Sequence, residues 1–133
     1  MSIQYSTALR NARLAADETT LGTAPKLRLY SGSPPANCAA AASGTLLATL
    51  TCPSDWQAAA ASGAADLANG PWTGAATTGG NIGHFRLLDS SETTVHMQGT
   101  VGTSGADLIL DSVAVSAAQG ISISQFLRTT GNA

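Results

Sequence analysis

The sequence predicts a mainly β protein, either an antiparallel β-sandwich or a jelly roll, with one N-terminal α-helix. Apolar and polar residues alternate along several short segments, and turns rich in Gly, Ser and Thr separate these segments at intervals of roughly 10 to 15 residues. A helical pattern is present near the N-terminus. Because 133 residues suit one hydrophobic core, we expect a helical arm at residues 1–22 and a single β-sandwich at residues 23–133.

The N-terminal arm has the signals of a helix with defined ends. Ser6 suits the N-cap position and Gly22 suits the C-cap. A weak apolar stripe is predicted at helical spacing, formed by Leu9, Ala12, Ala16 and Thr19. We expect Arg13 and Asp17, which are one helical turn apart, to pair on the helix surface. The helix is expected to pack at the rim of the sandwich or against another subunit.

Short strands are predicted in the first half of the sandwich. Residues 26–30 alternate with their leucines inward, and residues 45–51 alternate so that the expected inward face consists of Leu46, Ala48 and Leu50. The alanine run at residues 58–61 is compatible with a helical turn or a loop. Turn signals on both sides of residues 72–78 favour a short edge strand there.

The clearest alternation lies in residues 83–102 and predicts a half-buried β-hairpin with a four- or five-residue loop at Asp89–Thr93. One parity is apolar and is expected to face the core: Phe85, Leu87, Val95, Met97 and Val101. The other parity is polar: His84, Arg86, Thr94, His96, Gln98 and Thr100. We expect that polar face to be half-exposed.

The C-terminal region predicts two further strands. Residues 107–111 form one of them, and residues 112–116 are a candidate continuation of it. Residues 121–129 alternate at first, but Phe126 has the opposite parity. This change predicts either a bulge near Gln125 or burial of both faces of the strand.

Charged residues are scarce, at 11% of the chain against roughly a quarter in average globular proteins. A soluble monomer normally carries more charge, so this composition favours an assembly component, or alternatively a secreted module solubilised by hydroxyl groups. The six Lys and Arg residues are not clustered, which argues against nucleic-acid binding. Neither a membrane span nor a signal peptide is recognisable, so we expect synthesis in the cytoplasm.

Candidates for reactive chemistry are few. No GxGxxG, GxxxxGK[ST], HExxH or GxSxG motif is present, so we expect no catalytic residues and no cofactor. Cys38 and Cys52 are best interpreted as free thiols, with a disulfide or a metal site as alternatives. If the hairpin turn is centred near Ser90, His84 lies opposite His96, where two imidazoles could share a metal or respond to mild acid. The simpler interpretation is two half-exposed polar residues.

Trp56 and Trp72 flank the alanine-rich middle of the chain. They are interpreted mainly as structural residues that plug an end of the sandwich or lie in a subunit interface. The alternative is an exposed platform on which sugar rings stack. Most of the acidic residues lie in or beside turns, where solvation or Asx-type hydrogen bonds are expected: Asp55, Asp66, Asp89, Glu92, Asp107 and Asp111.

Five segments resemble, in the same order, a family of small virion proteins of tailed bacteriophages: STALRNARL (6–14), KLRLYSGSPP (26–35), LLATL (46–50), the hairpin (83–102) and ADLILDSVAVSAAQGISISQF (106–126). The resemblance implies a structural role in the virion, as a decoration or cement protein that binds the major capsid protein and forms a homo-oligomer such as a trimer. Attachment to the tail or fibre, or a receptor- or glycan-binding module, is the alternative. The resemblance to this family implies no catalytic residues.

With such a role, five residues become candidates for interfaces with capsid or sister subunits: Leu9, Arg10, Arg13, Trp56 and Trp72.

Overall fold

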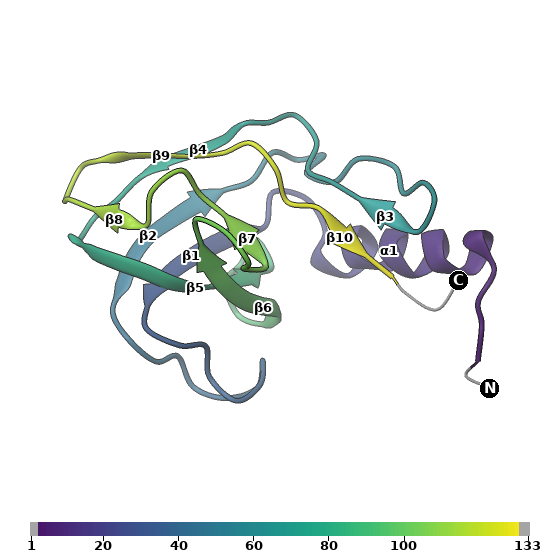
Figure 1. Cartoon of the computed structure of the whole chain (residues 1–133), viewed down its shortest axis with the longest axis horizontal. Helices are drawn as coiled ribbons and strands as arrows, with labels where there is room; N and C mark the ends of the chain where they lie inside the picture. The colour runs from purple at the N-terminus through teal and green to yellow at the C-terminus, as the bar shows by residue number, and fades with distance from the viewer. Residues whose placement is uncertain (1–2, 131–133) are drawn as a thin grey trace.

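A computed structural model describes residues 3–130 and confirms a mainly β fold with one N-terminal helix (Figure 1). The helix α1 spans Thr7–Leu21. The strands that follow it are β1 (Lys26–Ser31), β2 (Leu46–Thr51), β3 (Ala64–Ala65), β4 (Trp72–Ala75), β5 (Gly80–Leu88), β6 (Val95–Gly102), β7 (Leu108–Ile109), β8 (Ala114–Val115), β9 (Gly120–Ile123) and β10 (Arg128–Thr129).

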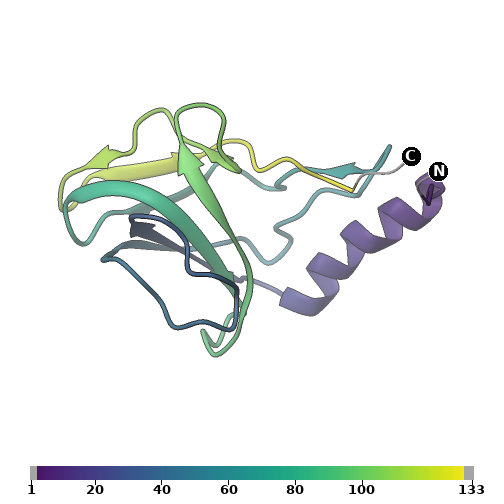
Figure 2. The same ribbon diagram turned by 60° about the horizontal axis from the view of Figure 1, so that its bottom comes forward.

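The strands form one large sheet and two small ones. The large sheet has the order β2-β1-β5-β6-β7, and β8 pairs with the first residues of β5. Its neighbours are antiparallel except β6 and β7, which are parallel. β4 and β9 form a second layer above the large sheet, whereas β3 and β10 form a ribbon beside α1 (Figures 1 and 2).

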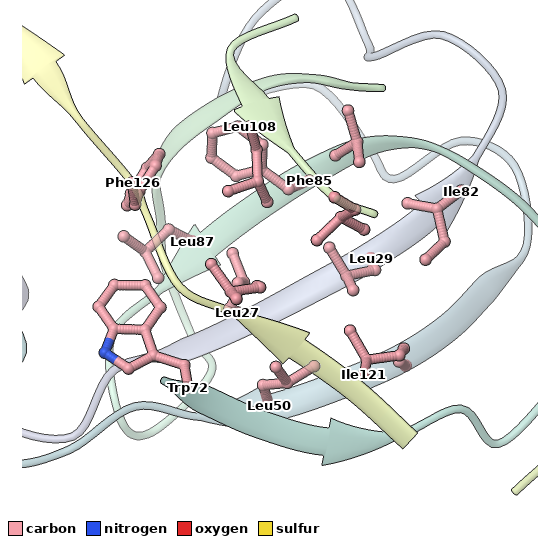
Figure 3. Packing of buried hydrophobic residues seen from close by; sticks show 14 of the residues in the cluster. Leu27, Leu29, Leu50, Trp72, Ile82, Phe85, Leu87, Leu108, Ile121 and Phe126 are labelled. Atoms are coloured by element: carbon pink, nitrogen blue, oxygen red, sulfur yellow. The ribbon is translucent and has the colours of Figure 1, made fainter. Parts of the chain in front are cut away.

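The hydrophobic core fills the space between the large sheet and the β4–β9 pair (Figure 3). Leucines of β1, β2 and β5 meet isoleucines of β9 there. The Phe126 ring lies edge-on to both Phe85 and Trp72, at centroid distances of 5.4 and 5.9 Å. An isolated bridge between Ala48 and Ala76 joins the edge of β2 to the end of β4, so the two layers are closed on that side.

The side chains that β2 turns toward the core differ from those predicted. Tyr30 pairs with Leu46 while Leu29 pairs with Ala48, which leaves Leu47 as the extra residue of a bulge. Leu47 is therefore buried, and Leu46, which was expected to face inward, is 37% exposed. An inserted residue reverses the parity of everything before it, and the alternation of side chains alone does not reveal the insertion.

Three further expectations are corrected or decided. Of the two alternatives for residues 58–61, the structure has the loop and not the helical turn, since the Ala58 N–H donates to Asp66 O and Ala61 bridges to Ala64. Residues 112–116 do not continue β7, because β8 crosses to pair with β5. Phe126 reaches the core because β9 ends at Ile123, after which the Phe126 N–H donates to Asp66 Oδ1.

The ends of α1 are those predicted, but its buried side is not. The Ser6 hydroxyl accepts from the Leu9 N–H, and the Gly22 N–H donates to Glu18 O. The buried residues are Leu14 and Leu21, whereas the predicted stripe is exposed along its whole length: Leu9, Ala12, Ala16 and Thr19. Burial of two leucines stabilises the fold more than burial of a stripe with one leucine, two alanines and a threonine, because the stabilisation is proportional to the apolar area buried.

The bulge in β2 makes a direct test of the fold. We expect Leu47→Ala to lower the free energy of unfolding by about 3 kcal/mol, because it leaves a cavity in the core, and Leu46→Ala to lower it by less than about 1 kcal/mol. Urea denaturation of the two variants measures the difference. Equal losses, or a larger loss for Leu46→Ala, would show that β2 has the unbulged register.

Candidate functional site

The structure does not bring His84 and His96 together. His84 pairs with Thr100, and His96 lies four positions before Thr100 on β6, roughly 13 Å along the strand. There are two reasons: the hairpin loop runs from Asp89 to Thr94, one residue longer than predicted, and the register between β5 and β6 shifts between Leu87 and Leu88. The predicted histidine pair is therefore wrong, and with it the idea that two imidazoles share a metal on this hairpin.

His84 is also fully buried rather than half-exposed. Its ring stacks on Tyr30, with centroids 5.1 Å apart and planes 6° from parallel. The Nδ1–H donates to Gly32 O at 2.9 Å. The side chain thus holds the start of the β1–β2 loop against the sheet.

Arg86 and Gln98 hold the remainder of that loop. Arg86 is 3% exposed, and its Nη2 donates to the carbonyl oxygens of Cys38 and Ala40 at 2.9 Å and to that of Asn37 at 3.4 Å. Gln98 Nε2 donates to Pro35 O at 2.8 Å. With His84, these side chains form a cluster, here called the loop clamp, that pins residues 32–40 over the polar face of β5 and β6. A buried charge needs hydrogen-bond partners, and main-chain carbonyls provide them for Arg86 Nη2, whereas Arg86 Nε has none.

Alternation in the sequence could not reveal the loop clamp. It identified the polar face of the hairpin correctly, but a polar face normally points to water, and the covering loop lies about 50 residues earlier in the chain. One nitrogen of each clamp side chain donates to a carbonyl of the same loop, whereas His84 Nε2, Arg86 Nε and Gln98 Oε1 are buried without a partner. This arrangement is suited to holding the loop in place.

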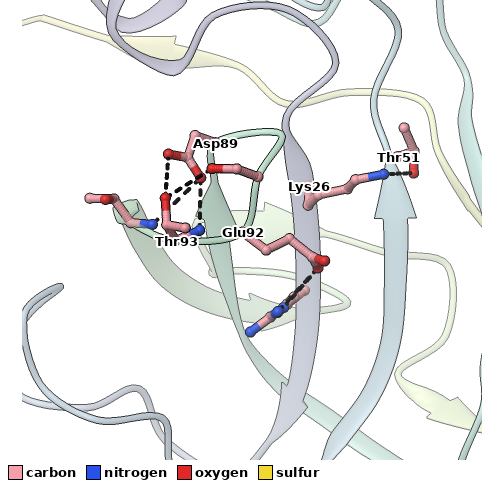
Figure 4. Close-up of polar contacts among 8 residues, drawn as sticks. Lys26, Thr51, Asp89, Glu92 and Thr93 are labelled. Atoms are coloured by element: carbon pink, nitrogen blue, oxygen red, sulfur yellow. Dashed lines mark hydrogen bonds and ion pairs between the residues drawn. The ribbon is translucent and has the colours of Figure 1, made fainter.

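The exposed polar contacts around the β5–β6 loop are local (Figure 4). Asp89 accepts from both the backbone N–H and the hydroxyl of Thr93 at 3.0 Å, and the backbone bond lowers the pKa of Asp89. This confirms the Asx-type role expected for that residue. Arg28 pairs with Glu92 at 3.1 Å. A solvent-accessible ion pair of this kind contributes at most about 1 kcal/mol to stability. These contacts therefore order the loop and add little to the stability of the fold.

Trp56 and Trp72 are buried, at 0% and 1% exposed. Their rings meet at 6.3 Å, and their indole N–H groups donate to Gly22 O and Ala68 O respectively. Of the two structural interpretations, burial supports packing within the fold. Their expected places in an exposed sugar platform or in a subunit interface are wrong, because the single chain already covers both rings.

The inner side of α1 is fastened to the β3–β10 ribbon. Arg10 Nε donates to Thr130 O at 2.6 Å, so this interface candidate is engaged within the chain. Asp17 pairs with Arg128 of β10 and not with Arg13 as predicted. Burial raises the pKa of Asp17, an effect that Arg128 partly offsets. Arg13 instead lies over the Tyr5 ring, 3.9 Å from its centroid.

What remains accessible on the helix is its opposite side, here called the outer face of α1. It consists of Leu9, Ala12, Arg13, Ala16 and Thr19, all exposed. Leu9 is 45% exposed, and Ile3, which precedes the helix, is 71% exposed. Of the candidates predicted from sequence, Leu9 and Arg13 are the two that the fold leaves on an accessible surface.

Within residues 3–130, no group of three His, Cys, Asp or Glu side chains is arranged to hold a metal ion. In the same part of the chain, no helix combines the length and the apolar character needed to cross a bilayer. Both cysteines are free: Cys38 is half-buried in the clamped loop, and Cys52 is buried at 2% exposed. Burial raises the pKa of the Cys52 thiol to about 12.

Comparisons with protein-family models, with curated proteins and with solved structures found no match to this chain. The relation to phage virion proteins therefore remains a prediction from sequence.

The two thiols should differ sharply in reactivity. At pH 8 we expect a thiol-specific reagent to modify Cys38 in the folded protein and Cys52 only after denaturation, because the thiolate is the reactive form and burial suppresses it at Cys52. Mass spectrometry of peptides after timed labelling measures both rates. Equal labelling of the two cysteines in the native protein would contradict the burial of Cys52.

The loop clamp predicts a local effect of Arg86. In Arg86→Met the carbonyls of the loop lose their donor, and since each bond to a charged group contributes about 1.5–3 kcal/mol, we expect the labelling rate of Cys38 to rise at least about tenfold. Arg28→Met, which removes a half-buried arginine opposite Arg86 on β1, is the matched control and should leave the rate unchanged. Cys52 reports global unfolding in the same sample. An unchanged Cys38 rate in Arg86→Met would show that the clamp does not hold the loop.

Proposed function

We propose that this chain is a non-enzymatic structural protein of a tailed-bacteriophage virion, which decorates the capsid and attaches through the outer face of α1. The phage context comes from the resemblance of five sequence segments. The mode of attachment comes from one structural observation, namely that α1 presents an accessible side with a single charged residue, Arg13. Exposed apolar residues on such a surface are typical of sites that bind other proteins.

The composition of the outer face supports a close contact. Alanines at two of its five positions allow a partner to approach the helix backbone, and Leu9 and Ile3 supply larger apolar groups beside them. Charges on the other side of the helix are already used, since Arg10 and Asp17 bind the β3–β10 ribbon. Arg13 is therefore the one charged residue of the outer face whose desolvation would oppose binding.

The anchoring of α1 supports the proposal as well. Leu14 and Leu21 are buried, Gln57 donates to Leu14 O, and Trp56 donates to Gly22 O. A helix held at both halves is already ordered, so a partner that binds its outer face avoids much of the entropy cost of fixing it. The same anchors mean that removal of residues 1–22 would disturb the core, which makes point substitutions the better test.

The test uses phage particles assembled with the variant Ala12→Glu/Ala16→Glu. Glutamate preserves helix propensity but places charge in the contact, so we expect incorporation to fall at least about tenfold, equivalent to about 1.4 kcal/mol, while the melting temperature shifts by less than about 4 °C. Ser104→Glu, in the exposed turn before β7, is the matched control. Quantitative mass spectrometry of purified virions gives the copy number.

The outcomes separate the alternatives. Many copies on the head support decoration, whereas a few copies at one vertex would assign the chain to the tail or fibre. Absence of the wild-type chain from purified virions would overturn the proposed function. Normal incorporation of Ala12→Glu/Ala16→Glu would instead show that attachment uses another surface.

A further inference from the structure

The two layers of the fold meet at β2 and β4 but leave a groove on the opposite side of the large sheet. The groove has a volume of about 420 Å³ and lies between β6 and residues 126–129, which follow β9. Phe85 and Phe126, whose rings are in contact, also line it (Figure 3). Its volume is within the range of roughly 300 to 1,000 Å³ that is usual for binding sites.

Large apolar side chains are exposed at the mouth of this groove. Leu127 lines it and is 50% exposed, and Ile109, which is 42% exposed, lines an adjoining recess together with Leu127. Met97, in the wall formed by β6, is half-buried and packs against the core. Exposed apolar residues beside a recess are typical of sites that bind another molecule.

The β6 strand also has a free main-chain edge at the groove. The Thr100 N–H donates to Asp107 Oδ2, and Gly102 O accepts from the Leu110 N–H, so the main-chain groups of both residues point away from β5. Every second residue of a strand directs these groups to the same side, which places the N–H and C=O of Gln98 there as well. Among the hydrogen bonds formed within residues 3–130, neither group has a partner. A strand edge of this kind is recognised by an extended main chain.

The charges of the groove indicate which polypeptide fits it. Of its two charged residues, Arg128 is paired with Asp17, whereas Asp107 is exposed and takes part in neither ion pair found among residues 3–130. A Lys or Arg in the occupant complements Asp107. A second copy of this chain has no free extended segment with such a residue, because all its basic residues lie in α1 or in paired strands: Arg10, Arg13, Lys26, Arg28, Arg86 and Arg128.

We propose that the groove binds an extended segment of a different polypeptide, which adds a strand to the edge of β6. The main chain of this segment bonds to the N–H and C=O of Gln98, an apolar side chain contacts Leu127 and Met97, and a Lys or Arg pairs with Asp107. None of these residues belongs to the outer face of α1. The inference therefore concerns a separate surface and goes beyond the proposed function.

The purified full-length chain tests the proposal with peptides as probes. Selection from a library of random peptides should enrich sequences in which apolar residues alternate and a Lys or Arg is present. A synthetic peptide with an enriched sequence should slow hydrogen exchange of the Gln98 amide at least about tenfold, because the N–H becomes hydrogen-bonded. Nuclear magnetic resonance measures this rate. The amide of Gly105, in the exposed turn before β7, is the matched control and should exchange at an unchanged rate.

Titration calorimetry with the same peptide tests the contacts. Leu127→Asp should weaken binding at least about tenfold, whereas Ser104→Asp, in the exposed turn, should bind as the wild type does. Asp107→Asn keeps an acceptor for the Thr100 N–H but removes the charge, so it should weaken binding and reduce its dependence on salt. Thermal melting verifies that each variant is folded.

A pair of variants at Gln98 isolates the main-chain bond. Gln98→Ala and Gln98→Pro both lose the side chain, but only proline loses the N–H, and an edge strand tolerates proline where the N–H points outward. We expect Gln98→Pro to bind the peptide more weakly than Gln98→Ala by about tenfold.

Two results would contradict strand addition at β6. One is a selection in which no enriched peptide depends on Leu127, and the other is a bound peptide that leaves exchange of the Gln98 amide unchanged. Self-association of the wild type that Leu127→Asp abolishes would assign the groove to a second copy and equally overturn the proposal. Because these measurements use the isolated chain, their outcome is independent of whether the chain decorates capsids.

Discussion

Burial of β5 on both faces is the constraint on which the rest of the fold depends. Residues 84–88 of this strand are all buried. Phe85 and Leu87 face the core, which requires the β4–β9 layer above them. His84 and Arg86 face the other way, and that side is covered by residues 32–40, whose carbonyls accept from His84 Nδ1 and Arg86 Nη2. A loop without regular secondary structure is thereby made part of the packed fold.

The two ends of the molecule differ in how charge is used. Near α1, Arg10, Asp17 and Arg128 make contacts that hold the helix to the β3–β10 ribbon. At the opposite end the surface around Leu46 consists mainly of small and hydroxyl-bearing side chains, and Asp111 lines the depression beside it. Both ion pairs found among residues 3–130, Arg28–Glu92 and Arg128–Asp17, join elements that are far apart in the sequence. This arrangement leaves two distinct surfaces, one helical and one built from strand tips.

Predictions from the sequence succeeded where the signal was local. Capping residues placed both ends of α1, and alternation identified β1, the hairpin and its apolar face. They failed where a distant segment decided the outcome. Arg13 and Asp17 have good spacing for a pair, but Arg128, from the other end of the chain, binds Asp17 instead. The histidine pair failed because a longer loop and a register shift moved His96 away from His84.

The sequence by itself therefore determined the fold class, the helix and its limits, and the scarcity of charge. Helix propensity and periodicity depend only on residues that are near one another in the chain, and composition does not depend on residue order at all. Only the tertiary structure decided which surfaces are free. It buried Trp56, Trp72, His84 and Arg86, and it exposed Leu46 and the outer face of α1. The physical reason is that exposure depends on which segments cover one another, and a bulge or a covering loop changes that without altering the local pattern.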